Sequence, residues 1–224
     1  MLLAIDTATR QISLALHDGA SVVAESTWST TNNHTVELAP NTALMLRRAG
    51  LEPGHLRGIA VALGPGSYTG LRIGLGLAKG LALAHTVPLL GVPTFEILMR
   101  AQSPRDEHVI AVIHAGRGRI SAQAYRWAKR GWTPAGETHV LDWAALAADI
   151  GEPTFICGEV DGAGLEQLRK LKAKVTLASP AQSLRRAGYL AEIGWERLRA
   201  STPSMDDPNT LAPIYGGRPE GVGV

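Results

Sequence analysis

The alternation of apolar and polar residues over positions 2–27 predicts a β-hairpin, or the first two strands of a meander, with its turn at Asp18-Gly19. Residues 34–50 change to helical spacing, and Gly50 is placed to cap the end of that helix. Pro40 lies near its first turn and predicts a mild kink. Apolar runs at 56–64 and 87–93 predict buried strands, and between them lie a glycine loop and a long helix.

The pattern restarts after residue 107. Residues 108–127 predict two strands around a Gly-Arg-Gly turn, and helices and strands alternate from 142 to a long final helix at 181–200. Each half begins with a meander and continues into alternating helix and strand, as distant repeats would. We therefore expect an α/β fold with an N-terminal lobe at 1–102, a C-terminal lobe at 103–204 and an extended tail at 205–224.

Composition narrows the class of protein. Of the 224 residues, 45% are hydrophobic and 19% charged, with a net charge of +2, which is typical of a globular protein. The sequence shows neither a signal peptide nor an apolar run long enough to cross a membrane. Its single cysteine, Cys157, excludes an internal disulfide and fits a reducing compartment. We expect a cytoplasmic protein without membrane contact.

Basic residues gather along one predicted hairpin, where either a solvated surface or a contact with nucleic acid would explain them: Arg117, Arg119, Arg126, Lys129 and Arg130.

The glycine segment "ALGPGSYTGLRIGLGLAKGLAL" at 62–83 resembles a phosphate-binding loop, but its spacing excludes the specific motifs. Thr69 stands where a P-loop needs its second glycine and where a dinucleotide fingerprint needs its third. Pro65 and Thr69 occupy the two glycine positions of a nucleophile elbow around Ser67. A general phosphate nest at the helix N-terminus and a tight strand-to-helix turn both remain possible.

The helix after this loop is apolar or small on almost every side, which predicts cover on more than one face. Its small residues form two stripes, Gly70, Gly74 and Ala78 on one and Gly76, Gly80 and Ala84 on the other. Each such glycine costs about 0.8–1 kcal/mol relative to alanine in a helix, so close packing should compensate. One stripe would lie on the chain's own sheet; the other would meet an internal helix or a helix of another subunit.

Catalytic side chains are few. The seven histidines are scattered without metal-binding spacing, and Cys157 lies in an apolar strand without a basic neighbour in sequence. Asp6, Thr7 and Thr9 follow the first strand, where they would either face a nucleotide phosphate or form a turn satisfied by the chain itself. We predict no catalytic residue and no metal site, and a weak nucleotide site at these three residues.

Four segments together resemble the TsaB (YeaZ-like) family of tRNA threonylcarbamoyladenosine biosynthesis proteins. They are "LAIDTAT" at 3–9, "HTVELAP" at 34–40, "LGPGSYTGLRIGLGLAKGLAL" at 63–83 and "GVPTFEIL" at 91–98. The resemblance implies two related lobes of the actin-like, sugar-kinase-like ATPase (ribonuclease-H-like) fold. It also implies a non-catalytic paralogue of TsaD, the subunit that transfers a threonylcarbamoyl group to adenosine next to tRNA anticodons, and a small ATPase, TsaE, as a further partner.

The metal motif of TsaD supports the non-catalytic assignment. Its two histidine positions fall on Thr94 and Leu98, and only Glu96 of the motif persists. The second half departs from the family at His114 and Arg119. The leading hypothesis is a scaffold or activating subunit. One alternative is a stand-alone ATPase or small-molecule kinase. Another is a metallopeptidase, although the absence of both metal-binding histidines argues against it.

The resemblance also implies a partner face on the helices at 35–48 and 69–85, used with TsaD or, when the chain is alone, in a homodimer. ATP or ADP with Mg would lie at a subunit interface, and tRNA would be reached through the complex. The positions predicted for this face are Leu38, Thr42, Met45, Gly70, Leu71, Gly74, Leu75 and Ala78.

Overall fold

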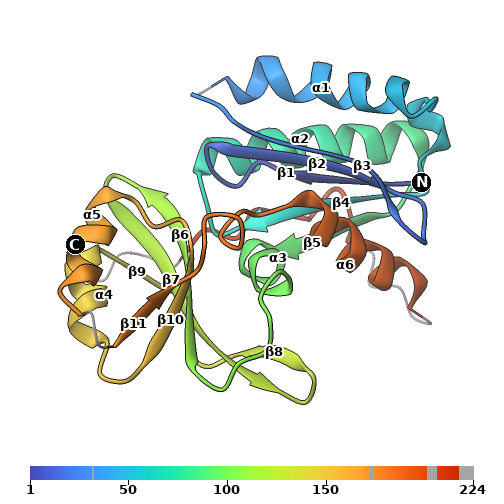
Figure 1. The fold of residues 1–224 in the computed structure, drawn as a ribbon. Coiled ribbons are helices and arrows are strands. Elements are labelled where there is room, and N and C mark those ends of the chain that lie inside the picture. Colours follow the sequence, from blue (N-terminus) through green and yellow to red (C-terminus); the bar gives the residue numbers. More distant parts are fainter. Residues whose placement is uncertain (32, 172–173, 201–205, 217–224) are drawn as a thin grey trace. The chain divides into compact units, whose positions relative to one another are not determined.

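The computed structural model describes residues 1–31, 33–171, 174–200 and 206–216. They divide into two compact units, each with its own sheet (Figure 1). The first lobe comprises Met1–Ile97 and Arg185–Ile214; the second comprises Leu98–Leu184 with residues 215 and 216. The predicted boundary at 204 is therefore wrong, because the final long helix and most of the described tail belong to the first lobe. The boundary predicted at 102 lies between Ile97 and Leu98.

The first lobe is built on a five-stranded sheet with the order β3-β2-β1-β4-β5. β1, β2 and β3 form the predicted antiparallel meander, and β4 and β5 continue the sheet in parallel from β1. The bounds are β1 Leu2–Asp6, β2 Gln11–His17, β3 Val22–Ser29, β4 Gly58–Gly64 and β5 Leu89–Pro93.

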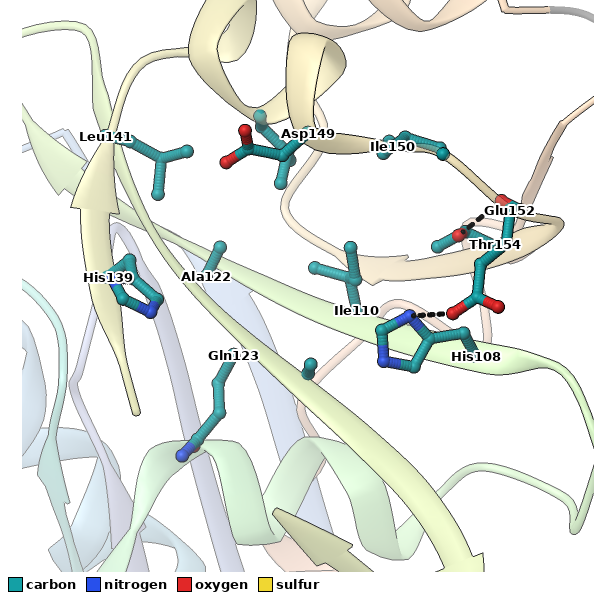
Figure 2. Close-up of a pocket in the computed structure, with 13 residues that line it drawn as sticks. His108, Ile110, Ala122, Gln123, His139, Leu141, Asp149, Ile150, Glu152 and Thr154 are labelled. Carbon is teal, nitrogen blue, oxygen red and sulfur yellow. Dashed lines mark hydrogen bonds and ion pairs between the residues drawn. The ribbon is translucent and has the colours of Figure 1, made fainter. Parts of the chain in front are cut away.

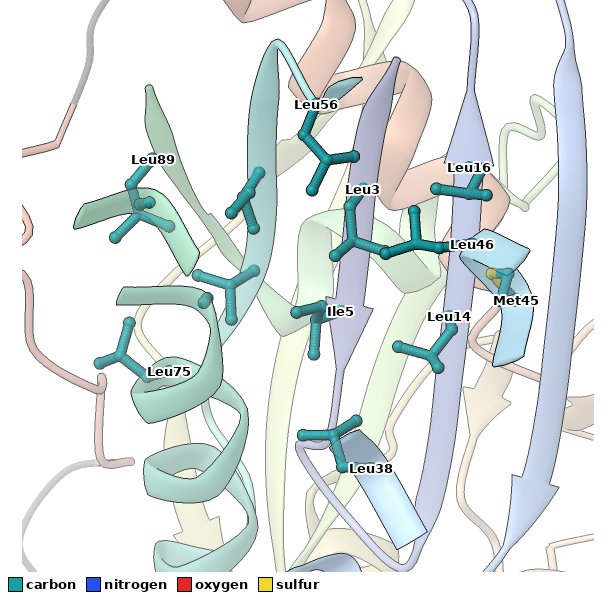
Figure 3. Close-up of a cluster of buried hydrophobic side chains, with 14 of the residues drawn as sticks. Leu3, Ile5, Leu14, Leu16, Leu38, Met45, Leu46, Leu56, Leu75 and Leu89 are labelled. Carbon is teal, nitrogen blue, oxygen red and sulfur yellow. The ribbon is translucent and has the colours of Figure 1, made fainter. Parts of the chain in front are cut away.

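Helices cover both faces of this sheet. α1 (His34–Arg48) and α2 (Tyr68–His85) lie over one face, and α6 (Ala187–Arg199) lies over the other (Figure 1). Along β1, Leu3 and Ile5 point into the core under α1 and α2, shown in Figure 3, whereas Leu2 and Ala4 join the core beneath α6. Because the strand is buried on both faces, it is apolar from Leu2 to Ile5 and does not show the alternation expected over 2–27.

The face beneath α6 is lined by small residues. Ala4, Ala15, Ala60 and Ala62 are all buried there, so the helix can approach the sheet closely. At Gly194 of α6 an added Cβ would lie 2.6 Å from the Cβ of Ala60. The alanines in the strands therefore identify the sheet face that receives the returning C-terminal helix.

Part of the tail is fixed to the first sheet. The N–H of Asp206 donates to the carbonyl of Leu89, and its carboxylate accepts from the N–H of Gly91 at 2.7 Å. Further on, the N–H of Ile214 donates to the carbonyl of Leu63 at 2.7 Å. Of the tail predicted to be extended, Asp206 forms an isolated antiparallel bridge with Leu89, whereas residues 208–210 form a turn. Residues 201–205 and 217–224 lie outside the described part of the chain.

The second lobe repeats the strand order of the first. Its meander β6, β7 and β8 is antiparallel, and β10 and β11 extend the sheet in parallel from β6, with β9 paired to β7. The bounds are β6 His108–Gly116, β7 Arg119–Ala128, β8 Gly131–Pro134, β9 His139–Leu141, β10 Thr154–Gly158 and β11 Val175–Leu177. The common order confirms that the lobes are related.

Two short helices, α4 (Trp143–Asp149) and α5 (Gly162–Arg169), pack on the second sheet. The carboxylate of Asp142 caps α4 by accepting from the N–H of Ala145, and that of Asp161 caps α5 in the same way. The remaining helical segments are the 3-10 turn η1 (Pro53–His55) and α3 (Thr94–Arg100). Within the described ranges, we find no helix with the length and apolar character needed to cross a membrane.

Candidate functional site

The residues that follow β1 form a tightly bonded turn. Asp6, Thr7 and Thr9 are 1%, 1% and 5% exposed. Asp6 accepts a hydrogen bond from the N–H of Ala8 at 2.8 Å, and its other carboxylate oxygen lies 3.1 Å from Nε of Arg185. Arg185 is itself 1% exposed and donates from Nη2 to the hydroxyl of Thr9 at 2.7 Å. Asp6 and Arg185 are thus a buried, hydrogen-bonded ion pair.

Helix α2 is fixed to the same turn. The hydroxyl of Thr7 donates to the carbonyl of Gly70 at 2.8 Å. A Cβ at Gly70 would lie 2.3 Å from the carbonyl oxygen of Thr7, and one at Gly66 would lie 2.1 Å from that of Ala8. The N–H of Ser67 donates to the carbonyl of Ala8, and the Ser67 hydroxyl accepts from the N–H of Gly70. These glycines therefore serve a strand-to-helix turn packed against the end of β1.

The nucleotide site predicted at Asp6, Thr7 and Thr9 does not match this geometry. A magnesium ion needs accessible carboxylate oxygens, but Asp6 is buried with a guanidinium as its counter-charge. Both threonine hydroxyls are hydrogen-bonded within the chain. The residues present do not fit a metal-bound nucleotide here, and their role is to hold β1, α2 and the segment before α6 together.

The eight positions predicted for a partner face are all buried in the first lobe. Figure 3 shows Leu38, Met45 and Leu75 pointing into the core beside Leu3 and Leu14. A side chain packed against its own sheet cannot contribute its surface to a second chain. The prediction chose the inward sides of α1 and α2, a correction that applies to Leu38, Thr42, Met45, Gly70, Leu71, Gly74, Leu75 and Ala78.

The opposite sides of α1 and α2 point away from the sheet and are apolar. Val36 is 67% exposed and Leu83 is 58% exposed. An added Cβ at Gly76 or Gly80 would meet no atom within 4 Å, so packing inside the chain does not explain these helical glycines. We define the outward α1–α2 face by its exposed residues Val36, Ala39, Pro40, Ala43, Gly76, Gly80, Leu83 and Ala84.

Polar groups lie close to this face. The indole N–H of Trp28 donates to the carboxylate of Glu37 at 2.8 Å, and this hydrogen bond lowers the pKa of Glu37. At the first turn of α2, the guanidinium of Arg72 lies 3.9 Å from the centre of the Tyr68 ring. The apolar residues of the outward α1–α2 face are exposed to water, which solvates them poorly.

The second lobe contains a hollow of about 420 Å³, shown in Figure 2. Nδ1 of His108 lies 3.4 Å from the carboxylate of Glu152, whose backbone carbonyl accepts from the Thr154 hydroxyl at 2.9 Å. Its lining contains neither serine nor cysteine, so it provides no hydroxyl or thiol nucleophile beyond buried Thr154. The lining residues are His108, Ile110, Ala122, Gln123, Ala124, His139, Leu141, Leu146, Asp149, Ile150, Gly151, Glu152 and Thr154. This hollow was not predicted from the sequence because its residues come from four stretches of the chain, at 108–110, 122–124, 139–141 and 146–154.

The other candidate residues from the sequence are buried or paired within the chain. Thr94 and Leu98 are fully buried, and Glu96 is ion-paired with Arg197 at 2.6 Å. Burial raises the pKa of the Cys157 thiol to about 12, so it stays protonated at neutral pH. Nε2 of His114 lies 3.9 Å from the carboxylate of Asp161. Across the described residues, no three His, Cys, Asp or Glu side chains are placed to hold a metal ion.

The two lobes with one common strand order have the fold of actin-like and sugar-kinase-like proteins. A family profile described as TsaD, tRNA N6-adenosine threonylcarbamoyltransferase, matches residues 21–182. The chain is 30% identical to the tRNA threonylcarbamoyladenosine biosynthesis protein TsaB of Bacillus subtilis, over 96% of this chain and 93% of that protein. The chain belongs to the TsaB (YeaZ-like) family.

Two further comparisons agree with this assignment. The TsaB protein of Escherichia coli is 32% identical over 142 residues, which cover 62% of this chain and 61% of that protein. Among solved structures, YeaZ from Pseudomonas aeruginosa superimposes with a TM-score of 0.72 at 26% identity, covering 96% of this chain and 98% of that one.

Proposed function

We propose that this chain is a scaffold or activating subunit in the synthesis of tRNA threonylcarbamoyladenosine, and that it binds the catalytic TsaD-type transferase. The curated relatives that it matches along nearly its whole length are named for this pathway. Its own contribution is contact rather than a reaction, because Asp6 is committed to Arg185 and Cys157 is buried. A small TsaE-type ATPase completes the proposed assembly, and tRNA is reached through it.

The single observation that supports the contact is the outward α1–α2 face. Val36 and Leu83 expose large apolar surfaces, and Gly76 and Gly80 keep the α2 backbone open where no residue of the chain packs. Glycines in a helix let a second helix approach closely, and that approach compensates for their cost in helix stability. In the absence of the transferase, the same face would pair with a second copy in a two-fold homodimer.

ATP or ADP with Mg, where the assembly uses it, would then bind with residues of more than one subunit. Asp6, Thr7 and Thr9 of this chain alone offer no accessible ligand for such a group. The nucleotide site is accordingly proposed for the assembled complex.

Substitution of Gly80 tests the proposed contact. Gly80→Leu adds bulk where the chain itself has open space, and leucine favours the helix, so the variant should fold at least as stably as the wild type. Its co-elution with the TsaD-type subunit of the same organism should be lost, with an affinity about tenfold or more weaker, because the added side chain blocks close helix approach.

The matched control is Ala163→Leu, which places the same leucine side chain at an exposed position on α5 of the second lobe. It should co-elute like the wild type. Wild-type affinity of the Gly80→Leu variant for the transferase subunit would rule out this face as the contact.

A further inference from the structure

The turn between β7 and β8 has a backbone that its residues disfavour. Ala128 pairs with Gly131, so Lys129 and Arg130 alone form a two-residue loop, with φ values of +50° and +71°. Such loops normally use Asn-Gly, because a side chain in the left-handed region costs about 1–2 kcal/mol per residue. Disfavoured backbone of this kind concentrates at functional sites. The stability of the turn therefore does not explain why lysine and arginine occupy these two positions.

An aromatic pair supports the same turn. Trp127 lies opposite Trp132 across the two strands, with ring centres 5.4 Å apart in an edge-to-face arrangement. The indole N–H of Trp132 donates to the carbonyl of Gln102 at 3.1 Å, which fixes that ring. Trp127 remains 37% exposed beside the basic turn. In Figure 1 the β7–β8 ribbon extends away from α4 and α5, so neither helix covers it.

Charge at this end of the ribbon is positive. Residues 126–136 contain Arg126, Lys129 and Arg130 and no acidic residue, and all three basic side chains are exposed. Arg126 lies 4.0 Å from the carboxylate of Glu152, a marginal ion-pair distance. The basic cluster visible in the sequence is divided, because Arg117 and Arg119 lie at the opposite end of the ten-residue strand β7.

We propose that the basic tip formed by Arg126, Trp127, Lys129 and Arg130 binds RNA that has unpaired bases. Lysine and arginine neutralise phosphates, and an exposed indole provides a surface on which an unpaired base stacks. An anionic membrane would also use both the charges and the ring, because indoles gather at membrane interfaces. Binding of the wild type to phosphatidylserine vesicles but not to an RNA stem-loop would therefore overturn the inference. The inference deepens the proposed function, since it gives this subunit its own contact with the RNA that the assembly modifies.

The test separates charge from turn geometry. The double variant Lys129→Asn/Arg130→Gly installs the favoured turn residues, so its melting temperature should equal or exceed that of the wild type. Its affinity for a fluorescein-labelled RNA stem-loop should fall, and the slope of log affinity against log salt should decrease by about 1.4 for two lost phosphate contacts. Trp127→Ala should weaken binding about fivefold to a hundredfold, and Trp127→Phe should restore part of it.

Two controls accompany these measurements on the full-length chain. Arg169→Gln/Lys170→Gln removes the same charge from the exposed end of α5 and should bind RNA like the wild type. Heparin, a polyanion without bases, should be insensitive to Trp127→Ala. An undetectable affinity of the wild type for the stem-loop, or an unchanged affinity of the tip variants, would overturn the inference. Co-elution with the TsaD-type subunit is measured separately, so the proposed function can stand when this inference fails.

Discussion

Asp6 and Arg185 lie 179 residues apart in the chain and form a buried pair in the first lobe. Neither residue has a local sequence signal for the other: Asp6 ends a strand, and Arg185 precedes the final helix within a basic stretch. Once two charges are removed from water, each depends on its partner, because an unpaired buried charge is strongly unfavourable. The pair therefore fixes the return of the chain to the first sheet.

Replacing Arg185 should destabilise the protein severely. Arg185→Met leaves the Asp6 carboxylate buried without its counter-charge, and we expect a loss of about 3–5 kcal/mol in the free energy of unfolding. Adjacent Arg186 is the control, because its ion pair with Glu25 is largely exposed on the arginine side and Arg186→Met should cost far less. Urea denaturation measures both. Equal effects of the two variants would contradict a special role for the buried pair.

The single cysteine makes a prediction about alkaline pH. The pKa of Cys157 rises from its ordinary value of 9.0 to about 12 on folding. Between about pH 9 and 12 the folded state therefore retains a proton that the unfolded state loses. The thiol therefore makes no pH-dependent contribution to stability below pH 9. As the pH rises from about 9 to 12 it lowers the free energy of unfolding by up to about 1.4 kcal/mol per pH unit.

Urea denaturation of the wild type and of Cys157→Ala as a function of pH isolates this effect. The difference between their free energies of unfolding should be constant below pH 9 and should shrink above it, since the variant lacks the titrating thiol. A difference that stays constant through pH 10.5 would mean that the thiol is accessible to water in the folded state.

At the scale of the element, α2 shows what periodicity can and cannot determine. The sequence predicts a helix with two stripes of small residues, and both stripes are present. It does not say which one faces the sheet. The structure buries Gly70, Gly74 and Ala78 and exposes Gly76, Gly80 and Ala84. The distinction depends on Thr7, which follows β1 and approaches Gly70 and Gly74 on only one side of the helix.

One chemical change at two positions of α2 should therefore have opposite effects. Gly70→Ala places a methyl group 2.3 Å from the Thr7 carbonyl oxygen, where backbone must move, and should cost about 1–3 kcal/mol. Gly76→Ala meets no atom within 4 Å and should stabilise by about 0.8–1 kcal/mol through helix propensity. Thermal unfolding monitored by circular dichroism measures both. Stabilisation by Gly70→Ala would show that the β1 turn packs more loosely than described.

Strongly patterned elements were predictable, and several of the short ones were not. The meander of the first lobe, α1 with its Pro40, and the strands β4 and β10 follow from periodicity. The four-residue β8, the three-residue β9 and the seven-residue α3 gave no usable signal. Elements this short contain about one repeat of their own pattern, so their conformation depends on the neighbour with which they pair.

At the scale of the whole molecule, both lobes use the same strand order, but the chain does not divide at one point between them. A sheet with parallel strands needs cover on both faces. In the first lobe α1 and α2 provide one layer, and the second layer arrives with α6 from the far end of the sequence. Composition showed no boundary there, because α6 has the amphipathic pattern of any surface helix.

The sequence by itself determined the order of the main elements, because periodicity is a local property of the chain. It also indicated the class of fold and the TsaB (YeaZ-like) family, because four short segments at 3–9, 34–40, 63–83 and 91–98 resemble that family. Only the tertiary structure decided which stripe of α2 is exposed, that Arg185 occupies the environment of Asp6, and that the basic residues divide between the two ends of β7. These facts depend on contacts between residues distant in sequence, whose partners are selected by the packing of the whole lobe and leave no pattern in the neighbouring residues.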